Sequence, residues 1–247
     1  MKKLLEFITT HRERFEVTQN NVFAFSWSKI TRRLAFLEIL EKNYIEASAA
    51  FIANSDAARQ LIKPGTHPVG PELAALHEAA IPLGAEVHLQ IESYYLFAKI
   101  ILDDVARAIE YYFGAARGLP LDSHDDLARS LAQYSAQKDI TVAPELVAAI
   151  ADLKRRISDV RDYKFSHEKS PRTMTGTMWG EDQLARIVMM RIYPRGSDPE
   201  QFDTEPLMIL RQSIDDYLDR VVDFVTGNEA KTVLKLEKAQ AQLDSGE

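Results

Sequence analysis

The stretch "HLQIESYYLFAKIILDDVARAIEYY", His88–Tyr112, is the most informative part of the chain for its architecture, because its apolar residues recur every three or four positions. This spacing predicts a long helix whose apolar face is broad rather than a narrow stripe. A helix with so wide an apolar face is covered by neighbours on more than one side, so we expect it at the centre of the protein. Its apolar positions are Ile91, Tyr94, Tyr95, Ala98, Ile101, Leu102, Val105, Ile109 and Tyr112.

Helical spacing extends outward from this stretch in both directions, and strand signals are nearly absent. The central pattern runs from about Glu72 to Gly114, with a bend expected at Pro82 and Gly84. A second long pattern, from about Asn21 to Ile62, precedes it, and the turn "KPGTHPVGPE" separates the two because Pro and Gly do not continue a helix. Further helices are expected after a cap at Asp122 or Ser123, from Pro144 onward, near Glu181–Tyr193, and over about Pro206–Thr226; residues 169–182 are expected to form an irregular loop.

These patterns predict the all-α class, as a bundle of long antiparallel helices with no sheet of more than two short strands. No linker marks a domain boundary, so we expect one all-helical domain over residues 1–226. The polar residues 227–247 are expected to form a frayed tail.

Composition restricts both the chemistry and the location of the protein. The 247 residues include no cysteine, which excludes disulfides, thiolate catalysis and cysteine-based zinc sites. The N-terminus does not have the apolar region of a signal peptide, and the most apolar run contains Lys99, Asp103 and Asp104. We therefore expect a cytoplasmic protein without a membrane partner.

The net charge of −7 disfavours a general nucleic-acid-binding protein, but one segment reverses this balance. One explanation for this local excess of basic residues is the preference for cations near a helix C-terminus, where the helix dipole is negative. The segment from Lys154 to Arg172 contains seven basic residues (Lys154, Arg155, Arg156, Arg161, Lys164, Lys169 and Arg172) and three acidic ones (Asp159, Asp162 and Glu168).

Familiar catalytic and metal-binding patterns are missing from the sequence. Glu-x-x-His pairs of di-iron bundles do not occur, and His88 with Glu92 supplies only two ligands on one helix face. The turn "KPGTHPVGPE" lacks the spacing of a phosphate-binding P-loop. Ser123 and His124 are adjacent, so they point apart on a helix. We expect no metal and no cofactor.

The helix that begins at Pro144 raises a more specific question at its C-terminal end. Its predicted buried stripe consists of Leu146, Ile150, Leu153, Ile157 and Val160, and continuing the period adds Lys164 and His167. A buried lysine or histidine requires a polar partner. At about 100° per residue, Arg161 lies some 120° from His167 around the helix axis. The two would converge only if the helix loosens near Ser166 or if a second copy supplies the complementary residue.

Arg161, the Asp162 that follows it, and His167 resemble the Arg-x(4–6)-His motif of the HEPN superfamily, with five residues between the arginine and the histidine. The stretch His88–Tyr112 is also similar to the long helix that precedes this motif in several HEPN-like bacterial proteins. The resemblance covers about residues 21–172. It implies a HEPN-like helical bundle that forms a homodimer with the two Arg/His motifs face to face.

Many HEPN proteins are metal-independent ribonucleases of toxin–antitoxin or phage-defence systems, and others are inactive binding or scaffold modules. By this resemblance His167 would act as general base on an RNA 2′-hydroxyl or as acid to the leaving oxygen. Arg161 would hold the scissile phosphate, and Asp162 would orient either side chain. A rim of Lys164, Lys169 and Arg172 would attract the RNA backbone.

Three interpretations follow from the sequence. The first is a HEPN-like metal-independent endoribonuclease whose partners are RNA, a second copy, and an antitoxin or regulatory protein. The second is a non-catalytic HEPN-like binding or regulatory module. The third is an unrelated helical protein in which "RDYKFSH" is an ordinary helix end.

Overall fold

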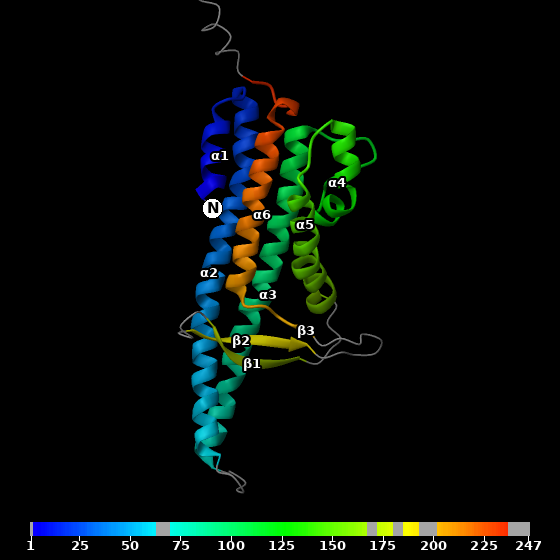
Figure 1. The fold of residues 1–247 in the computed structure, drawn as a ribbon. Helices are drawn as coiled ribbons and strands as arrows, with labels where there is room; N and C mark the ends of the chain where they lie inside the picture. Colours follow the sequence, from blue (N-terminus) through cyan, green and yellow to red (C-terminus); the bar gives the residue numbers. More distant parts are fainter. Residues whose placement is uncertain (1, 63–69, 167–171, 180–184, 193–201, 237–247) are drawn as a thin grey trace, which may run out of the picture. The chain divides into compact units, whose positions relative to one another are not determined.

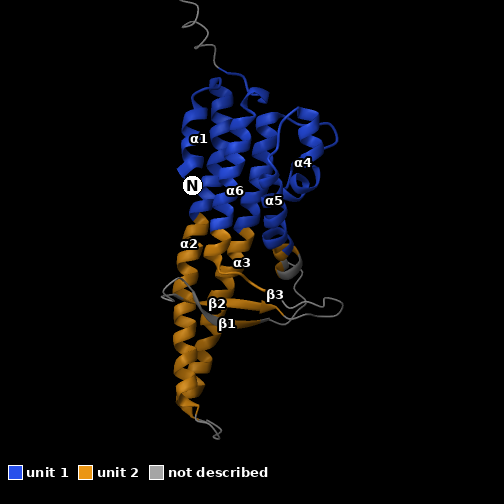
Figure 2. Cartoon of the chain, in the orientation of Figure 1, with its two compact units in different colours: residues 1–35, 97–159, 212–247 blue, residues 36–96, 160–211 orange. Residues whose placement is uncertain are grey.

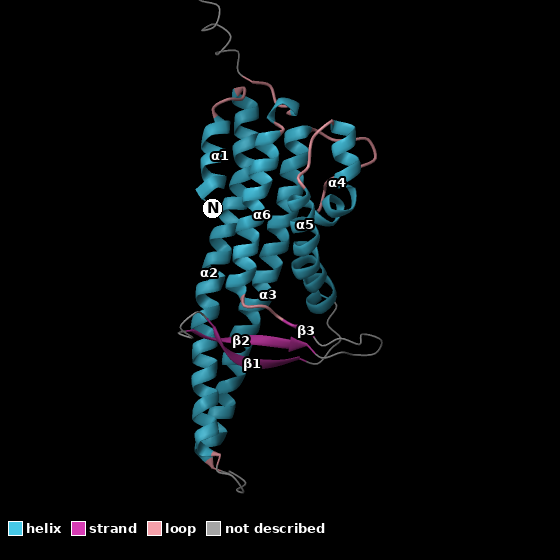
Figure 3. Ribbon diagram, viewed as in Figure 1, coloured by secondary structure: helices cyan, strands magenta, loops and turns pink. Residues whose placement is uncertain are grey.

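The fold contains two long helices, α2 (Val17–Leu61) and α3 (Pro71–Phe113). This computed structural model describes residues 2–62, 70–166, 172–179, 185–192 and 202–236. Figures 1 and 3 show that the described chain is mostly helical. The expected all-α class, a bundle of long helices, is confirmed. The remaining α-helices are α1 (Lys2–Arg12), α4 (His124–Lys138), α5 (Pro144–Leu153) and α6 (Leu207–Gly227).

The chain divides into two compact units (Figure 2). Unit 1 comprises residues 1–35, 97–159 and 212–247, and unit 2 comprises residues 36–96 and 160–211. Helices α2 and α3 belong partly to each unit, so the expected single domain over residues 1–226 stays a prediction.

Unit 1 is built on the second half of α3, and its apolar face is buried as expected. Aromatic rings join the neighbouring helices to it: Phe15 lies edge-on to Tyr112 of α3, with ring centroids 6.2 Å apart, and Phe113 lies 5.5 Å from Phe224 of α6. On α1, Phe7 contacts Trp27 of α2 edge-on at 4.9 Å. Edge-to-face pairs of this kind add to the stabilisation that burial alone provides.

The starts of α4 and α5 follow from local sequence chemistry. Ser123, one of the two expected caps, has an extended backbone, and its hydroxyl accepts a hydrogen bond from the backbone N–H of Asp126 at 3.2 Å. Pro144 occupies the first turn of α5, where its missing N–H costs no helical hydrogen bond. The two helices therefore begin where the sequence indicates.

Beyond Leu153 the helix does not keep regular α-geometry. Residues Lys154–Ser158 (η1) and Val160–Ser166 (η2) form π-helical segments, in which each N–H bonds five residues back. The predicted stripe is nevertheless buried at all five positions: Leu146, Ile150, Leu153, Ile157 and Val160.

Unit 2 contains a three-stranded antiparallel sheet in the order β1-β2-β3, which corrects three expectations. Strand β1 (Arg172–Trp179) lies where we expected an irregular loop. Strand β2 (Ala185–Ile192) lies where we expected a helix, and β3 (Phe202–Asp203) adds a third strand where at most two were expected. The run "ARIVMMRI" is too short to distinguish a helix from a buried strand by periodicity, and its pairing with β1 over eight residues favours the strand.

Side chains of α2 complete the hydrogen bonding of β2. Within the described residues, β3 pairs with Arg191 and Ile192, near one end of the second edge of β2. The hydroxyl of Tyr44 donates to the carbonyl of Val188 at 2.7 Å, and the N–H of Val188 donates to the hydroxyl of Ser48 at 3.2 Å. Both α2 side chains are buried, so these bonds satisfy backbone groups that water does not reach.

The expected frayed tail is wrong for residues 228–236, which are bonded to unit 1. The side-chain amide of Asn228 donates to the carbonyl of Thr141 at 2.8 Å and accepts from the N–H of the same residue at 2.8 Å. Further along, the N–H of Val233 donates to the carbonyl of Tyr112 at 3.1 Å. Polar composition indicated fraying, but these backbone pairings hold the segment; residues 237–247 lie outside the described part.

Truncation of the apolar face of α3 tests the central position of this helix. Ile101 is 0% exposed and Ile81, on the same helix, is 73% exposed. We expect Ile101→Ala to lower the free energy of unfolding by about 2–5 kcal/mol, since it leaves a cavity in the core. Ile81→Ala should change it by less than about 0.5 kcal/mol. Urea unfolding followed by circular dichroism measures both, and equal effects would contradict a buried α3 face.

Candidate functional site

Arg161 and Asp162, the first two residues of the predicted motif, form an ion pair on η2. The Nη1 of Arg161 donates to Oδ1 of Asp162 at 2.6 Å, and the two side chains are 37% and 36% exposed. The carboxylate therefore orients the guanidinium while leaving it accessible to solvent. The resemblance implied that Asp162 orients Arg161 or His167; that catalytic role stays a prediction.

Arg161 lines a groove of about 380 Å³ between η2 and α3. Phe165, four residues later on η2, lines the same groove and lies edge-on to Tyr95, with ring centroids 5.1 Å apart. Leu89 and Leu96 of α3, both exposed, provide further apolar surface. The polar groups of the groove are those of Arg161, Glu92 and Ser93.

The charged side chains described at this groove have no net positive charge. Arg161 is the cation, and Glu92 and Asp162 are carboxylates; Oε1 of Glu92 also lies 3.8 Å from Nδ1 of His88. This His88–Glu92 contact is the same-face pair expected from their spacing. Attraction of an RNA backbone would therefore depend on the basic residues that flank the groove in the sequence.

The other predicted site residues are not placed by the structure. His167 and Lys169 lie outside the described residues, and for Lys164 and Arg172 only the backbone is described. Convergence of Arg161 and His167 therefore stays a prediction. The angle of 120° between them assumed regular α-helix up to His167, and the π-helical winding of Val160–Ser166 removes that premise.

A charged cluster in unit 1 was not predicted from the sequence. The ammonium of Lys99, which is buried, donates to Asp103 and Asp125 at 2.8 Å each. Lys154 lies 2.5 Å from Asp159 and 3.5 Å from Asp125. Burial lowers the pKa of Lys99, but its hydrogen bonds to the two aspartates outweigh burial and hold that pKa above its ordinary value. The charges in "AKIILDD" were a signal of this cluster, because a lysine within an apolar face needs partners.

His124 is fully buried beside this cluster. Its ring lies edge-on to Tyr217, with centroids 5.7 Å apart, and within the described part of the chain neither ring nitrogen has a hydrogen-bond partner. Burial, followed by the positive charge of Lys99, lowers the pKa of His124 from 6.5 to about 3. The imidazole is therefore neutral at neutral pH and serves as part of the core rather than as a solvent-accessible base.

Comparison of the chain with protein-family models, with curated proteins and with solved structures gives no significant match. The resemblance to the HEPN superfamily consequently depends on the motif and helix quoted above. Within the described ranges, no group of three or more His, Asp or Glu side chains is arranged to hold a metal ion. A helix with the length and hydropathy of a membrane span is also not found among those residues.

The buried neutral state of His124 predicts a loss of stability in acid. The unfolded chain takes up a proton near pH 6.5, whereas the folded chain does so only near pH 3. Stability is therefore fully present above pH 6.5 and falls as the pH drops towards 3, by up to about 1.4 kcal/mol per pH unit. Between pH 7 and pH 5, the wild type should lose about 2 kcal/mol more than His124→Leu in urea unfolding.

His77→Leu is the matched control, because His77 is an exposed histidine on α3. It should keep the pH dependence of the wild type. An identical slope for the wild type and His124→Leu would contradict the prediction, because it would show that His124 takes up a proton as readily in the folded protein as in the unfolded chain.

Proposed function

We propose that this protein is a HEPN-like, metal-independent endoribonuclease with its active site in the segment from Arg161 to His167. The observation that carries the proposal is the Arg161–Asp162 pair: an accessible guanidinium, oriented by a carboxylate, on the wall of a groove. Its place on a π-helical segment adds support, since such segments occur frequently at functional sites.

The proposed reaction assigns one task to each residue. His167 removes the proton of an RNA 2′-hydroxyl, whose oxygen attacks the adjacent phosphorus, or it protonates the leaving 5′-oxygen. Arg161 binds the phosphate and stabilises the negative charge that develops on it. A homodimer would bring two such segments into one cleft, where one histidine acts as base and the other as acid. Lys164, Lys169 and Arg172 would rim that cleft and attract the RNA backbone.

A toxin–antitoxin or phage-defence role follows from the same resemblance. In this proposal the protein acts in the cytoplasm, and an antitoxin or regulatory protein restrains its activity. Such control is needed because a ribonuclease without it would degrade the RNA of its own cell.

A second candidate function, a non-catalytic binding or regulatory module, is favoured by the composition of the groove. Glu92 and Asp162 offset the charge of Arg161, and Leu89 is 61% exposed at the groove wall. Exposed apolar side chains beside a few charges are typical of protein-binding surfaces.

Cleavage of mixed RNA by the pure protein in EDTA tests the catalytic proposal. His167→Ala should lower the cleavage rate about 10²–10⁴-fold, since it removes the general acid–base group. Arg161→Ala should weaken RNA binding about tenfold or more and slow turnover as well, because it removes a charged phosphate contact. Gel analysis of cleavage and fluorescence anisotropy of labelled RNA measure the two effects.

His77→Ala and Arg129→Ala serve as controls: His77 is an exposed histidine, and Arg129 pairs with the nearby Asp126 on a helix, as Arg161 pairs with Asp162. Both should behave as the wild type. Activity that disappears in EDTA and returns with zinc or manganese would contradict the metal-independent mechanism. RNA binding without cleavage by the wild type would favour the second candidate, and a monomer at micromolar concentration in sedimentation would exclude the shared cleft.

A further inference from the structure

A second recess lies in unit 2, between α2 and the strands β1 and β2, and it is separate from the groove at Arg161. It has a volume of about 360 Å³, at the small end of the range for small-molecule sites. One face of α2 supplies most of its wall, because residues four and eight apart along a helix lie on the same side. Its lining residues are Phe51, Ile52, Ser55, Asp56, Arg59, Met174 and Arg186.

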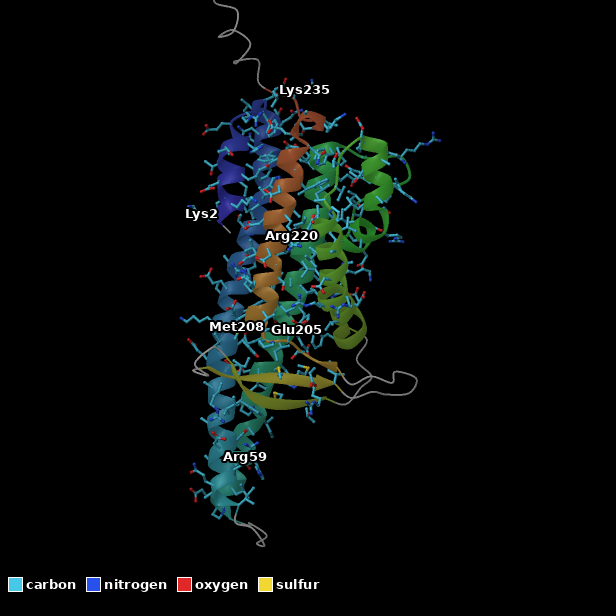
Figure 4. All side chains as sticks on the ribbon, in the orientation of Figure 1. Lys2, Arg59, Glu205, Met208, Arg220 and Lys235 are labelled. Atoms are coloured by element: carbon cyan, nitrogen blue, oxygen red, sulfur yellow. The ribbon has the colours of Figure 1, made fainter. Side chains whose placement is uncertain are left out.

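Two guanidinium groups converge on one carboxylate in this recess. Nη1 of Arg186 donates to Oδ2 of Asp56 at 2.5 Å, and Nη1 of Arg59 lies 3.9 Å from Oδ1 of the same residue (Figure 4 labels Arg59). The hydrogen bond from Arg186 lowers the pKa of Asp56 below its ordinary value, so the carboxylate is ionised at neutral pH. The lining therefore has a net charge of +1, in a chain whose net charge is −7.

Apart from Ser55, whose hydroxyl donates to the carbonyl of Phe51 at 2.9 Å, the rest of the recess is apolar. Phe51 and Ile52 of α2 and Met174 of β1 line it beside the charged groups. Met174 also lies against Gly84 of α3: a Cβ at position 84 would be 2.8 Å from the methyl group of Met174, so the end of the methionine would have to shift. This glycine lets the methionine approach the backbone of α3 closely, at the usual cost of glycine inside a helix.

We propose that this recess binds a small organic carboxylate, a monoanion with a short apolar body. A carboxylate would neutralise the net positive charge, and its two oxygens match the parallel N–H donors of a guanidinium. Each guanidinium has five N–H donors, and the ion pair with Asp56 uses Nη1 of Arg186. The apolar body would cover Phe51, Ile52 and Met174, which gives the site selectivity over inorganic anions.

Methyl NMR of the full-length chain tests this site directly, because Met174 is one of six methionines and its methyl signal can be assigned with Met174→Leu. Hexanoate should shift the Met174 signal in a saturable way. Hexanol, hexylamine, acetate and hexyl phosphate should each bind at least about tenfold more weakly. The reason is that each lacks either the single negative charge or the apolar body.

Arg59→Gln and Arg186→Gln should each lower the affinity for hexanoate about tenfold, since each removes a charged hydrogen-bond donor. Arg155→Gln is the matched control: Arg155 also follows an aspartate by three residues on a helix, and it is 72% exposed against 79% for Arg59. It should leave the affinity unchanged. The Arg59 variant is decisive, because substitution of so exposed a side chain leaves the fold intact. Substitution of Arg186 also removes a contact that joins β2 to α2, so its effect on affinity includes any effect on the fold.

Three results would overturn the proposal. Equal binding of hexanol would show that the charges do not contribute, and tighter binding of hexylamine or hexyl phosphate would assign a different ligand class. The absence of any Met174 shift at millimolar hexanoate would show that the recess does not bind carboxylates. None of these measurements involves RNA, so they are independent of the proposed ribonuclease activity.

Discussion

Burial of the broad apolar face of α3 is the constraint on which the rest of the structure depends. Each apolar position predicted from Ile91 to Tyr112 is buried, so neighbouring segments must cover this helix. The same burial requires partners for the charged residues within it, because an unpaired buried charge is costly. Lys99 is accordingly bonded to Asp103 and Asp125, and Asp104 is paired with Arg33 of α2. The ion pairs of Lys99 and Asp104 are thus a consequence of the hydrophobic core of unit 1.

The sheet of unit 2 shows how helices can complete a small β-structure. A strand with an unpaired edge leaves backbone groups that must bond to something else. Tyr44 and Ser48 supply those bonds at Val188, and Thr204 supplies another by accepting from the N–H of Met190 at 2.9 Å. Helix α2 therefore fixes the position of β2, and the recess between α2 and the hairpin follows from that docking.

The two candidate sites of unit 2 differ in their electrostatics. At the groove of Arg161 the described groups include two carboxylates and one guanidinium, whereas the recess of Arg186 has two guanidinium groups and one carboxylate. Anion binding at the first site needs the basic residues that follow it in the sequence, while the second site contains its own excess positive charge. The described geometry therefore supports anion recognition more directly at the recess, and catalysis depends on the segment that contains His167.

The sequence by itself determined the helical class, the extent of α2, α3 and α6, the cap at Ser123 and the stripe from Leu146 to Val160, because periodicity and capping are local properties. It also determined that Arg161 and Asp162 are neighbours in the chain, but not that they pair beside Phe165 in a groove. Strands β1 and β2 and the bonded segment 228–236 were decided by tertiary structure. These features share one physical reason. Each depends on hydrogen bonds or packing with residues elsewhere in the sequence, and these contacts override the weak local preferences for helix, strand or loop.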